Sequence, residues 1–176
     1  ERALAALTRY HEHLAQTLPA RTIEELKLSV VLETGLSECP EVVLTGKLDR
    51  LDIGADGALQ RVVDYKTGKP KSRNAIEGAT KNDDGGYKRQ LVFYALLLEL
   101  AGDTARQTRT MTLSFVEPTP AGDIKEETFT ITDEEIAALS AEITAAVHTI
   151  STGSAFATVP EASEYSTLAT QLVAGQ

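Results

Sequence analysis

The chain has 176 residues, of which 42% are hydrophobic, and its formal net charge is −9. This length suffices for one domain with its own core, and so negative a charge argues against the surface as a whole binding nucleic acid. Cys39 is the only cysteine, which excludes an internal disulfide and a cysteine-built zinc or iron–sulfur site and favours a reducing, cytoplasmic setting. The sequence contains no run of about 18 apolar residues, so it predicts no membrane span.

The first third of the chain predicts one helix and three strands. Residues 1–18 place leucines at helical spacing, and Pro19 ends the helix. Alternating apolar and polar residues predict strands over 23–32, 42–53 and 59–66, with a hairpin turn before the third strand. The chain begins without a methionine or a signal-peptide pattern, and we interpret it as a piece of a longer protein.

Residues 68–86 predict a long surface loop. The segment is rich in Gly, Lys, Asn and Asp, and Ile76 is its only large apolar residue. The surrounding window 61–90 holds eight basic residues against four acidic ones, although the whole chain is acidic. We therefore expect a local track for phosphate groups; the alternative is a solvated loop with scattered lysines.

The second half predicts two helices and two strands. Residues 87–101 form an apolar helix that Gly102 ends, and strands follow over 110–116 and 127–131. A capping box at Thr132 and Glu135 opens a further helix that runs to about Ile150, and residues 165–173 suit a short helix.

This order of elements predicts an α/β fold in a single domain over residues 1–176. Its mixed sheet consists of a three-strand meander, a crossover helix and further strands, and helices flank it.

Two acids and a lysine are prominent on the second and third predicted strands. Alternation along a strand puts Asp64 and Lys66 on one face, and pairing of the two strands as a hairpin brings Asp49 beside Asp64. Two neighbouring carboxylates repel each other unless a cation lies between them, and their oxygens suit a hard divalent ion. A lysine beside such an ion suggests work on phosphate or on an attacking water.

Three segments occur in the order Gly46-Lys47-Leu48-Asp49-Arg50-Leu51-Asp52, Asp64-Tyr65-Lys66-Thr67-Gly68 and Gln90-Leu91-Val92-Phe93-Tyr94-Ala95. Together they resemble the motifs of the RecB-like branch of the PD-(D/E)XK nuclease superfamily, over roughly residues 23 to 116. The resemblance implies a restriction-endonuclease-like core. It also implies a nuclease domain of the kind found at the C-terminus of UvrD/RecB-type DNA helicases.

The resemblance also implies roles for the residues of these motifs. Asp49, Asp64 and the backbone carbonyl of Tyr65 would bind Mg²⁺ or Mn²⁺. Lys66 would orient or help deprotonate the attacking water and stabilise charge on the phosphate. Asp52 lies three residues after Asp49, so we expect it to face the other side of the strand in a structural role.

The helix motif adds two polar residues to this site. Gln90 and Tyr94 are four residues apart and share a helix face. They would point at the metal site and contact water, phosphate or the lysine; ordinary helix packing is the alternative.

DNA is the substrate that the resemblance implies. We expect its phosphates to lie along the basic window, in contact with Lys69, Lys71, Arg73, Lys81, Lys88 and Arg89.

The chain also departs from the family pattern. Relatives carry a histidine metal ligand on an upstream helix, but His11 and His13 are two residues apart and cannot both face one site. We expect the family histidine to lie before residue 1. Glu25 resembles a glutamate of the family's first strand, and we expect it to be solvated. Many relatives hold an iron–sulfur cluster near the C-terminus, but that part of this chain has no cysteine, so we expect none.

The leading hypothesis is therefore a metal-dependent DNA nuclease domain that works beside helicase motor domains of the same chain in DNA end processing. Two alternatives remain open. One is a non-cleaving DNA-binding or docking module that retains the nuclease fold, and the other is a metal hydrolase of a small phosphorylated substrate. The intact set of Asp49, Asp64 and Lys66 favours the nuclease.

Overall fold

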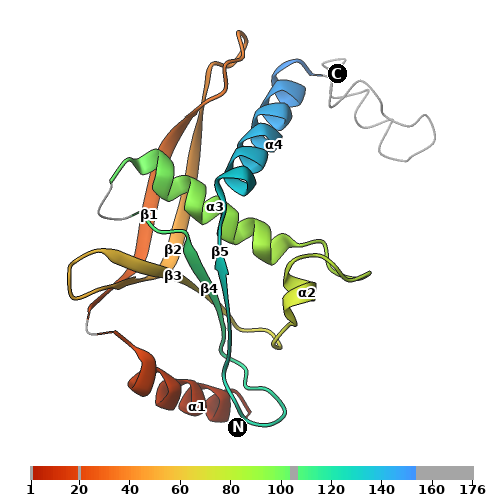
Figure 1. Cartoon of the computed structure of the whole chain (residues 1–176). Coiled ribbons are helices and arrows are strands. Elements are labelled where there is room, and N and C mark those ends of the chain that lie inside the picture. The colour runs from red at the N-terminus through yellow and green to blue at the C-terminus, as the bar shows by residue number, and fades with distance from the viewer. Residues whose placement is uncertain (1, 20, 104–106, 154–176) are drawn as a thin grey trace, which may run out of the picture. The chain divides into compact units, whose positions relative to one another are not determined.

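The computed structural model describes residues 2–19, 21–103 and 107–153. The elements in chain order are α1 (Arg2–Thr17), β1 (Arg21–Glu33), β2 (Glu41–Ile53), β3 (Leu59–Lys66), α2 (Arg73–Ile76), α3 (Gly86–Ala101), β4 (Thr110–Phe115), β5 (Lys125–Thr130) and α4 (Asp133–Ser151) (Figure 1). The short helix predicted at residues 165–173 lies outside the described residues.

The chain divides into two compact units. The larger unit comprises residues 1–32 and 43–140, and the smaller comprises residues 33–42 and the chain from residue 141. In the smaller unit, Thr34 N donates to Pro40 O (2.9 Å) across the turn after β1, and Glu38 Oε1 lies 2.5 Å from His148 Nδ1. His148 therefore contacts an acid within the smaller unit. Every residue of the predicted site lies in the larger unit.

Five strands form one mixed sheet in the order β1-β2-β3-β4-β5. β2 runs antiparallel to β3, β3 runs parallel to β4, and β4 runs antiparallel to β5. Parallel neighbours need a crossover connection, and the segment that contains α3 supplies it between β3 and β4. The prediction of a mixed sheet with a crossover helix is confirmed.

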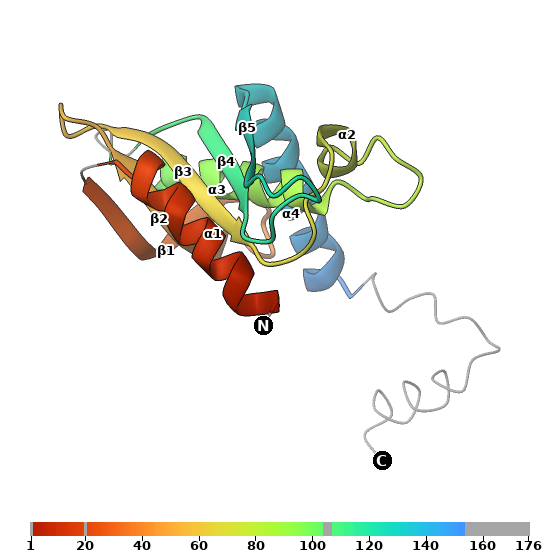
Figure 2. The same ribbon diagram turned by 90° about the horizontal axis from the view of Figure 1, so that it is seen from below.

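The register assigns the polar side chains of the central strands to two faces of this sheet. Tyr65 pairs with Ser114, which pairs in turn with Glu126. Because side chains alternate along a strand, these three share one face, and Asp64 and Lys66 lie on the other. Helix α3 covers the face of Asp64 and helix α1 covers the face of Tyr65 (Figure 2). We call them the α3 face and the α1 face.

Helix α3 packs closely on the sheet because its sequence is apolar nearly all round. Leu91, Ala95 and Leu97 are fully buried. Gly46 of β2 lies against this helix, where a Cβ atom would overlap Leu97 Cδ1 and come within 3.4 Å of Phe93 Cε1. The close approach of α3 therefore explains the glycine of the first motif.

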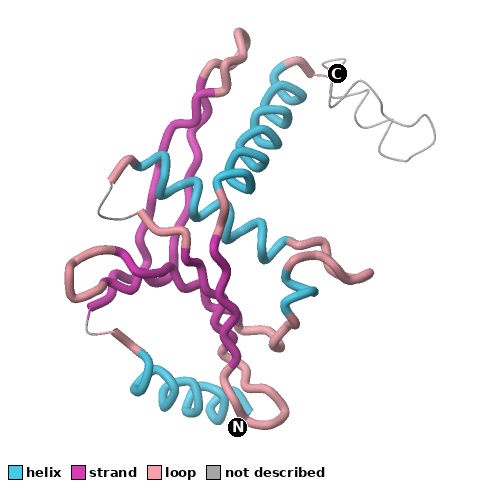
Figure 3. Tube along the Cα trace, viewed as in Figure 1, coloured by secondary structure: helices cyan, strands magenta, loops and turns pink. Residues whose placement is uncertain are grey.

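The predicted loop at 68–86 contains a one-turn helix that the sequence did not indicate. Figure 3 shows this helix, α2, between loop segments that lead from β3 to α3. It is capped by Ser72, whose Oγ accepts from Ala75 N (3.3 Å), and Ile76 is fully buried. The single large apolar residue of the segment thus anchors its middle to the core.

The ends of two other helices follow the predicted capping chemistry. Gly102 ends α3 with φ 70° and donates its N–H to Glu99 O. Glu135 N donates to Thr132 Oγ1 (3.2 Å), and Thr132 N donates to Glu135 Oε2 (2.9 Å), at the start of α4. None of the helices in the described part of the chain combines the length and hydrophobicity that crossing a membrane requires.

Candidate active site

Strand β3 ends with an acid and a lysine that form a buried ion pair on the α3 face. Asp64 is 2% exposed, and its Oδ2 lies 2.7 Å from Lys66 Nζ. Val62 and Val63 are fully buried beside them. Buried β-branched residues thus fix the strand end from which both polar side chains project.

Strand β2 brings a second acid to the same end of the sheet. The ladder between β2 and β3 ends at Arg50 and Val63, one residue before Asp49 and Asp64 would pair. Asp49 Oδ2 accepts a hydrogen bond from Tyr65 N (3.0 Å). A side chain of β2 thus bonds the backbone of β3 just beyond the last backbone pair of the two strands. The predicted proximity of the two carboxylates is reflected in the pKa of Asp64, which the negative charge of Asp49 helps to raise.

Helix α3 contributes an amide and a phenol to the ion pair. Gln90 Nε2 donates to Asp64 Oδ1 (2.8 Å) and to Tyr94 Oη (2.6 Å), and Tyr94 Oη donates to Asp64 Oδ1 (3.0 Å). Gln90 Oε1 in turn accepts from Lys66 Nζ (2.6 Å). Both residues therefore contact the predicted acid, and Gln90 also contacts the predicted lysine.

Burial sets the protonation behaviour of this cluster. It raises the pKa of Asp64 above its ordinary value, and this effect outweighs the hydrogen bond and positive charge of Lys66, which lower it. The pKa of Tyr94 is also raised, first by burial and then by the negative charge of Asp64. Tyr94 therefore keeps its proton and acts as a hydrogen-bond donor. The ionised form of Asp64 is destabilised by burial, so a nearby cation would stabilise it.

One residue of this cluster went unnoticed in the sequence. Tyr87 lies in the first turn of α3, and its ring centroid is 4.7 Å from Lys66 Nζ and 4.8 Å from Lys71 Nζ. The spacing of Tyr87, Gln90 and Tyr94 is i, i+3, i+7, which puts all three on one helix face. That spacing could have indicated Tyr87.

The α1 face holds a separate set of buried charges. Asp52 lies between two arginines, with Oδ1 2.8 Å from Arg50 Nε and Oδ2 2.7 Å from Arg61 Nε. Arg61 Nη1 also donates to Glu126 Oε2 (3.2 Å). Asp52 is thus on the opposite face from Asp64, in line with its expected structural role.

The ring of Tyr65 also lies on the α1 face. It meets the Tyr10 ring edge to face at 6.0 Å, and its Oη accepts from Arg50 Nη1 (2.9 Å). The backbone of Tyr65, in contrast, bonds Asp49 on the site side. This residue therefore joins the two faces, and its carbonyl stays a predicted ligand.

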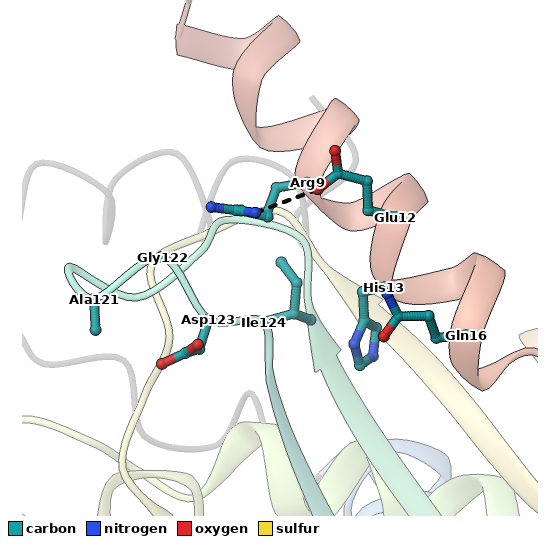
Figure 4. A pocket seen from close by; sticks show the side chains of 8 residues that line it. All are labelled: Arg9, Glu12, His13, Gln16, Ala121, Gly122, Asp123 and Ile124. Atoms are coloured by element: carbon teal, nitrogen blue, oxygen red, sulfur yellow. Dashed lines mark hydrogen bonds and ion pairs between the residues drawn. The ribbon is translucent and has the colours of Figure 1, made fainter.

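The two histidines of α1 lie away from the acids of the site. His13 Nε2 is 3.5 Å from Glu126 Oε1 on the α1 face, and His11 is exposed. His13 lines a pocket of about 250 Å³ between α1 and the loop before β5, together with Arg9, Glu12, Gln16 and residues 121–124 (Figure 4). This pocket is on the face opposite Asp64, so it lies apart from the predicted site.

Glu25 also lies apart from the acids. Its side chain is 71% exposed and Oε1 is 2.8 Å from Lys47 Nζ. Its φ of 54° marks an irregularity in the edge strand β1. These contacts agree with the expectation of a solvated glutamate.

The six basic residues expected to contact DNA differ in their surroundings. Lys71 forms an ion pair with Asp83. Arg73 packs on the Phe129 ring and lies 3.4 Å from Glu77, and Lys88 packs on the same ring and lies 3.0 Å from Glu135. The other three are exposed at the surface: Lys69, Lys81 and Arg89.

The oxygen atoms of the site suit a small divalent cation. Asp64 Oδ2 is buried, and its cationic neighbour is Lys66, whose Nζ lies 2.7 Å away. Within the described residues, no group of three or more His, Cys, Asp and Glu side chains could enclose a metal. Asp49 and Asp64, with the backbone carbonyl of Tyr65 as a further predicted oxygen ligand, suit a hard divalent cation, which binds carboxylate, carbonyl and water oxygens.

A family model described as the PD-(D/E)XK nuclease superfamily matches residues 1–165. The chain belongs to this superfamily. The five-stranded mixed sheet with flanking helices is consistent with the restriction-endonuclease-like fold of PD-(D/E)XK proteins. Members of the superfamily generally hydrolyse phosphodiester bonds and typically use divalent metal ions.

Comparison with individual proteins adds little to this assignment. The chain is similar to the protein in "Crystal structure of SSO0001", with 16% sequence identity and a TM-score of 0.44, over 83% of this chain and 58% of that one. It thus spans less than two thirds of that protein. No curated protein matches the chain.

Proposed function

We propose that this PD-(D/E)XK domain cleaves DNA, using Mg²⁺ or Mn²⁺, as the nuclease part of a cytoplasmic RecB-like helicase–nuclease that processes DNA ends. The observation that carries the proposal is the contact of Asp64 with Lys66, Gln90 and Tyr94 across β3 and α3. An ion pair with a purely structural role would need neither these additional partners from α3 nor a second acid, Asp49, at the same strand end.

The residues of the α3 face have separate tasks in this proposal. Asp49, Asp64 and the carbonyl of Tyr65 would hold the ion. A bound divalent ion lowers the pKa of a coordinated water and offsets negative charge on the phosphate. Lys66 places a positive charge where negative charge develops during hydrolysis.

In this proposal, Gln90 and Tyr94 orient the side chains of Asp64 and Lys66. Gln90 donates through its amide nitrogen to Asp64 and accepts from Lys66 through its oxygen, so one side chain sets the direction of both groups. Tyr94 directs Asp64 Oδ1 toward the helix, which leaves Oδ2 as the oxygen beside Lys66.

Cleavage of a labelled DNA strand by the full-length protein tests the proposal. Asp64→Ala and Lys66→Ala should each abolish cleavage in Mg²⁺ or Mn²⁺ while the far-UV circular dichroism stays unchanged. Asp56→Ala is a matched control because Asp56 lies in the turn between β2 and β3, where its Oδ1 bonds only the local N–H of Ala58. Cleavage that survives both site substitutions would refute the proposal. DNA binding without cleavage by the wild type would instead favour a docking module.

A further inference from the structure

The ring of Tyr87 contacts both the proposed catalytic lysine, Lys66, and a second lysine, Lys71, from the segment after β3. Lys66 Nζ and Lys71 Nζ are 4.7 and 4.8 Å from the centroid of its ring. A tyrosine ring attracts ammonium groups to its face and so restricts where they lie. One aromatic side chain therefore holds two positive charges near each other, at the edge of the site that would take the scissile phosphate.

Two lysines on one ring suit two successive phosphates of a strand. Both nitrogens are within 4.8 Å of the same point, so they lie no more than about 9.5 Å apart, a range that includes the separation of neighbouring phosphates on a strand. Lys66 is largely buried beside Asp64, whereas the Lys71 side chain is 40% exposed. Lys71 is therefore open to a phosphate that lies outside the catalytic centre.

An acid occupies Lys71 when no phosphate is present. Lys71 Nζ bonds Asp83 Oδ1, and Asp83 Oδ2 accepts from Thr80 Oγ1 (2.8 Å). The pair lies at the surface, with the Lys71 side chain 40% exposed and that of Asp83 18% exposed. Ion pairs in contact with solvent contribute little stability, so a phosphate oxygen can replace the carboxylate at small cost. The other two aromatic-bound cations of this region, Arg73 and Lys88, are on Phe129 and share no ring with the catalytic lysine.

We propose that Lys71, held by Tyr87, binds the phosphate adjacent to the scissile phosphate of the substrate strand, and that Asp83 occupies this position until the strand arrives. The inference rests on the proposed nuclease function and deepens it by assigning a second phosphate-binding position. Lys71 is then a binding residue, and Tyr87 is a positioning residue for both lysines.

The direction in which two substitutions change the KM for DNA distinguishes this binding role from a structural one. Lys71→Gln should raise the KM for DNA about tenfold, because one charge-assisted contact is lost, and Asp83→Asn should lower it. If the pair served only to hold the loop, both changes would weaken binding alike. Arg9→Gln is the matched charge control, because Arg9 lies on α1 and pairs with Glu12 on the opposite face.

The ring itself is tested by two substitutions of Tyr87. Tyr87→Phe keeps the aromatic face and should retain wild-type KM and cleavage. Tyr87→Leu removes that face and should raise KM as Lys71→Gln does, with a smaller further loss in kcat through Lys66. Equal kinetics for the two variants would overturn the positioning role.

DNA strands in which uncharged linkages replace chosen phosphates test the proposed contact of Lys71 directly. In one oligonucleotide, methylphosphonates replace every phosphate except one, which is then the only cleavable bond; in a second, two adjacent phosphates remain. The wild-type full-length protein in Mg²⁺ should show about a tenfold higher kcat/KM for the two-phosphate strand, and Lys71→Gln should lose this preference.

The outcomes of this experiment are distinct. If the wild type cleaves both strands and Lys71→Gln keeps the preference, the second phosphate position is refuted while the nuclease function stands. If the wild type cleaves neither strand nor unmodified DNA, the proposed nuclease function fails and the inference fails with it.

Discussion

The two faces of the sheet both bury charged residues, but the acids and bases are balanced differently on each. On the α1 face, Asp52 is enclosed by Arg50 and Arg61, so both of its oxygens have cationic partners. On the α3 face, Asp64 has one cationic partner among the described residues, Lys66 at 2.7 Å, and the negative charge of a second acid, Asp49, helps to raise its pKa. Burial of charge alone thus does not distinguish the two faces; the second acid beside a lysine does, and our proposal rests on it.

The pKa values of the two faces differ in the same way. Burial alone would raise the pKa of Glu126 on the α1 face, but the hydrogen bond from Ser114 and the charge of Arg61 lower it below its ordinary value. For Asp64, burial raises the pKa despite Lys66. The fold therefore gains from ionising Glu126 and loses from ionising Asp64, a cost that a bound cation would offset.

Removing charge from the α1 face should have the largest effect on stability. Asp52→Asn leaves Arg50, which is fully buried, without its carboxylate partner, and should lower the free energy of unfolding by about 3–5 kcal/mol. Urea denaturation measures this. Asp64→Asn is the comparison on the α3 face and should leave stability equal or higher in EDTA. A larger loss for Asp64→Asn would reverse the distinction between the faces.

Changing the helix partner of the site should reduce activity more than stability. Gln90→Leu removes the side chain that orients both Asp64 and Lys66 and should lower kcat by 10- to 100-fold, or about 1.4–2.7 kcal/mol in activation free energy. Steady-state cleavage with DNA well above KM isolates kcat. Leu100→Ala, at the far end of α3, controls for general effects on the helix. A change in KM alone would show that Gln90 binds substrate uniformly and does not orient the two groups.

A smaller effect is expected from the hydroxyl of Tyr10. This group is 2.6 Å from Ser114 Oγ under α1, and Tyr10→Phe should cost about 1 kcal/mol of stability without changing kcat. Thermal denaturation and cleavage, measured on the same sample, test both parts. A fall in kcat would show that α1 acts on the site through Tyr65.

The smallest expected effect is on how stability depends on pH, which should differ between the two faces. Because the folded-state pKa of Glu126 is lowered, its stabilisation is present above the unfolded pKa and is lost as pH falls through the folded one. Glu126→Gln should therefore be less stable than wild type at neutral pH, and the difference should shrink in acid.

The ionisation of Asp64 should change stability in the opposite direction. Its folded-state pKa is raised, so its ionisation destabilises the fold above that pKa, and the penalty disappears as pH falls through it. Asp64→Asn in EDTA should thus gain on wild type as pH rises. Urea midpoints from pH 4 to pH 8 for the two variants measure both trends. Parallel trends would contradict the contrast.

The sequence predicted the α3 face more fully than the α1 face. Asp64, Lys66, Gln90 and Tyr94 were recognisable because their spacing along one strand and one helix already places them on common faces. The partners of Asp52 were not, because Arg61 and Glu126 come from strands whose register depends on the tertiary fold.

Two further features needed the structure. Helix α2 arises because Ile76 finds a place in the core, which a polar local sequence does not indicate. The contact of Tyr87 with Lys71 depends on the path of the segment after β3, which the sequence does not indicate. The DNA contacts predicted for the basic window stay a prediction, and Lys71 is the one for which we propose a specific phosphate.

The most direct test of the central claim is the rate of DNA cleavage by the full-length protein as Mg²⁺ is titrated, for wild type and for Asp64→Asn. The α3-face site predicts that the wild-type rate rises to saturation with Mg²⁺ and returns to zero in EDTA. It predicts no cleavage by Asp64→Asn at any Mg²⁺ concentration, although that variant remains folded. A wild-type rate independent of Mg²⁺, or equal titration curves for the two proteins, would contradict the claim.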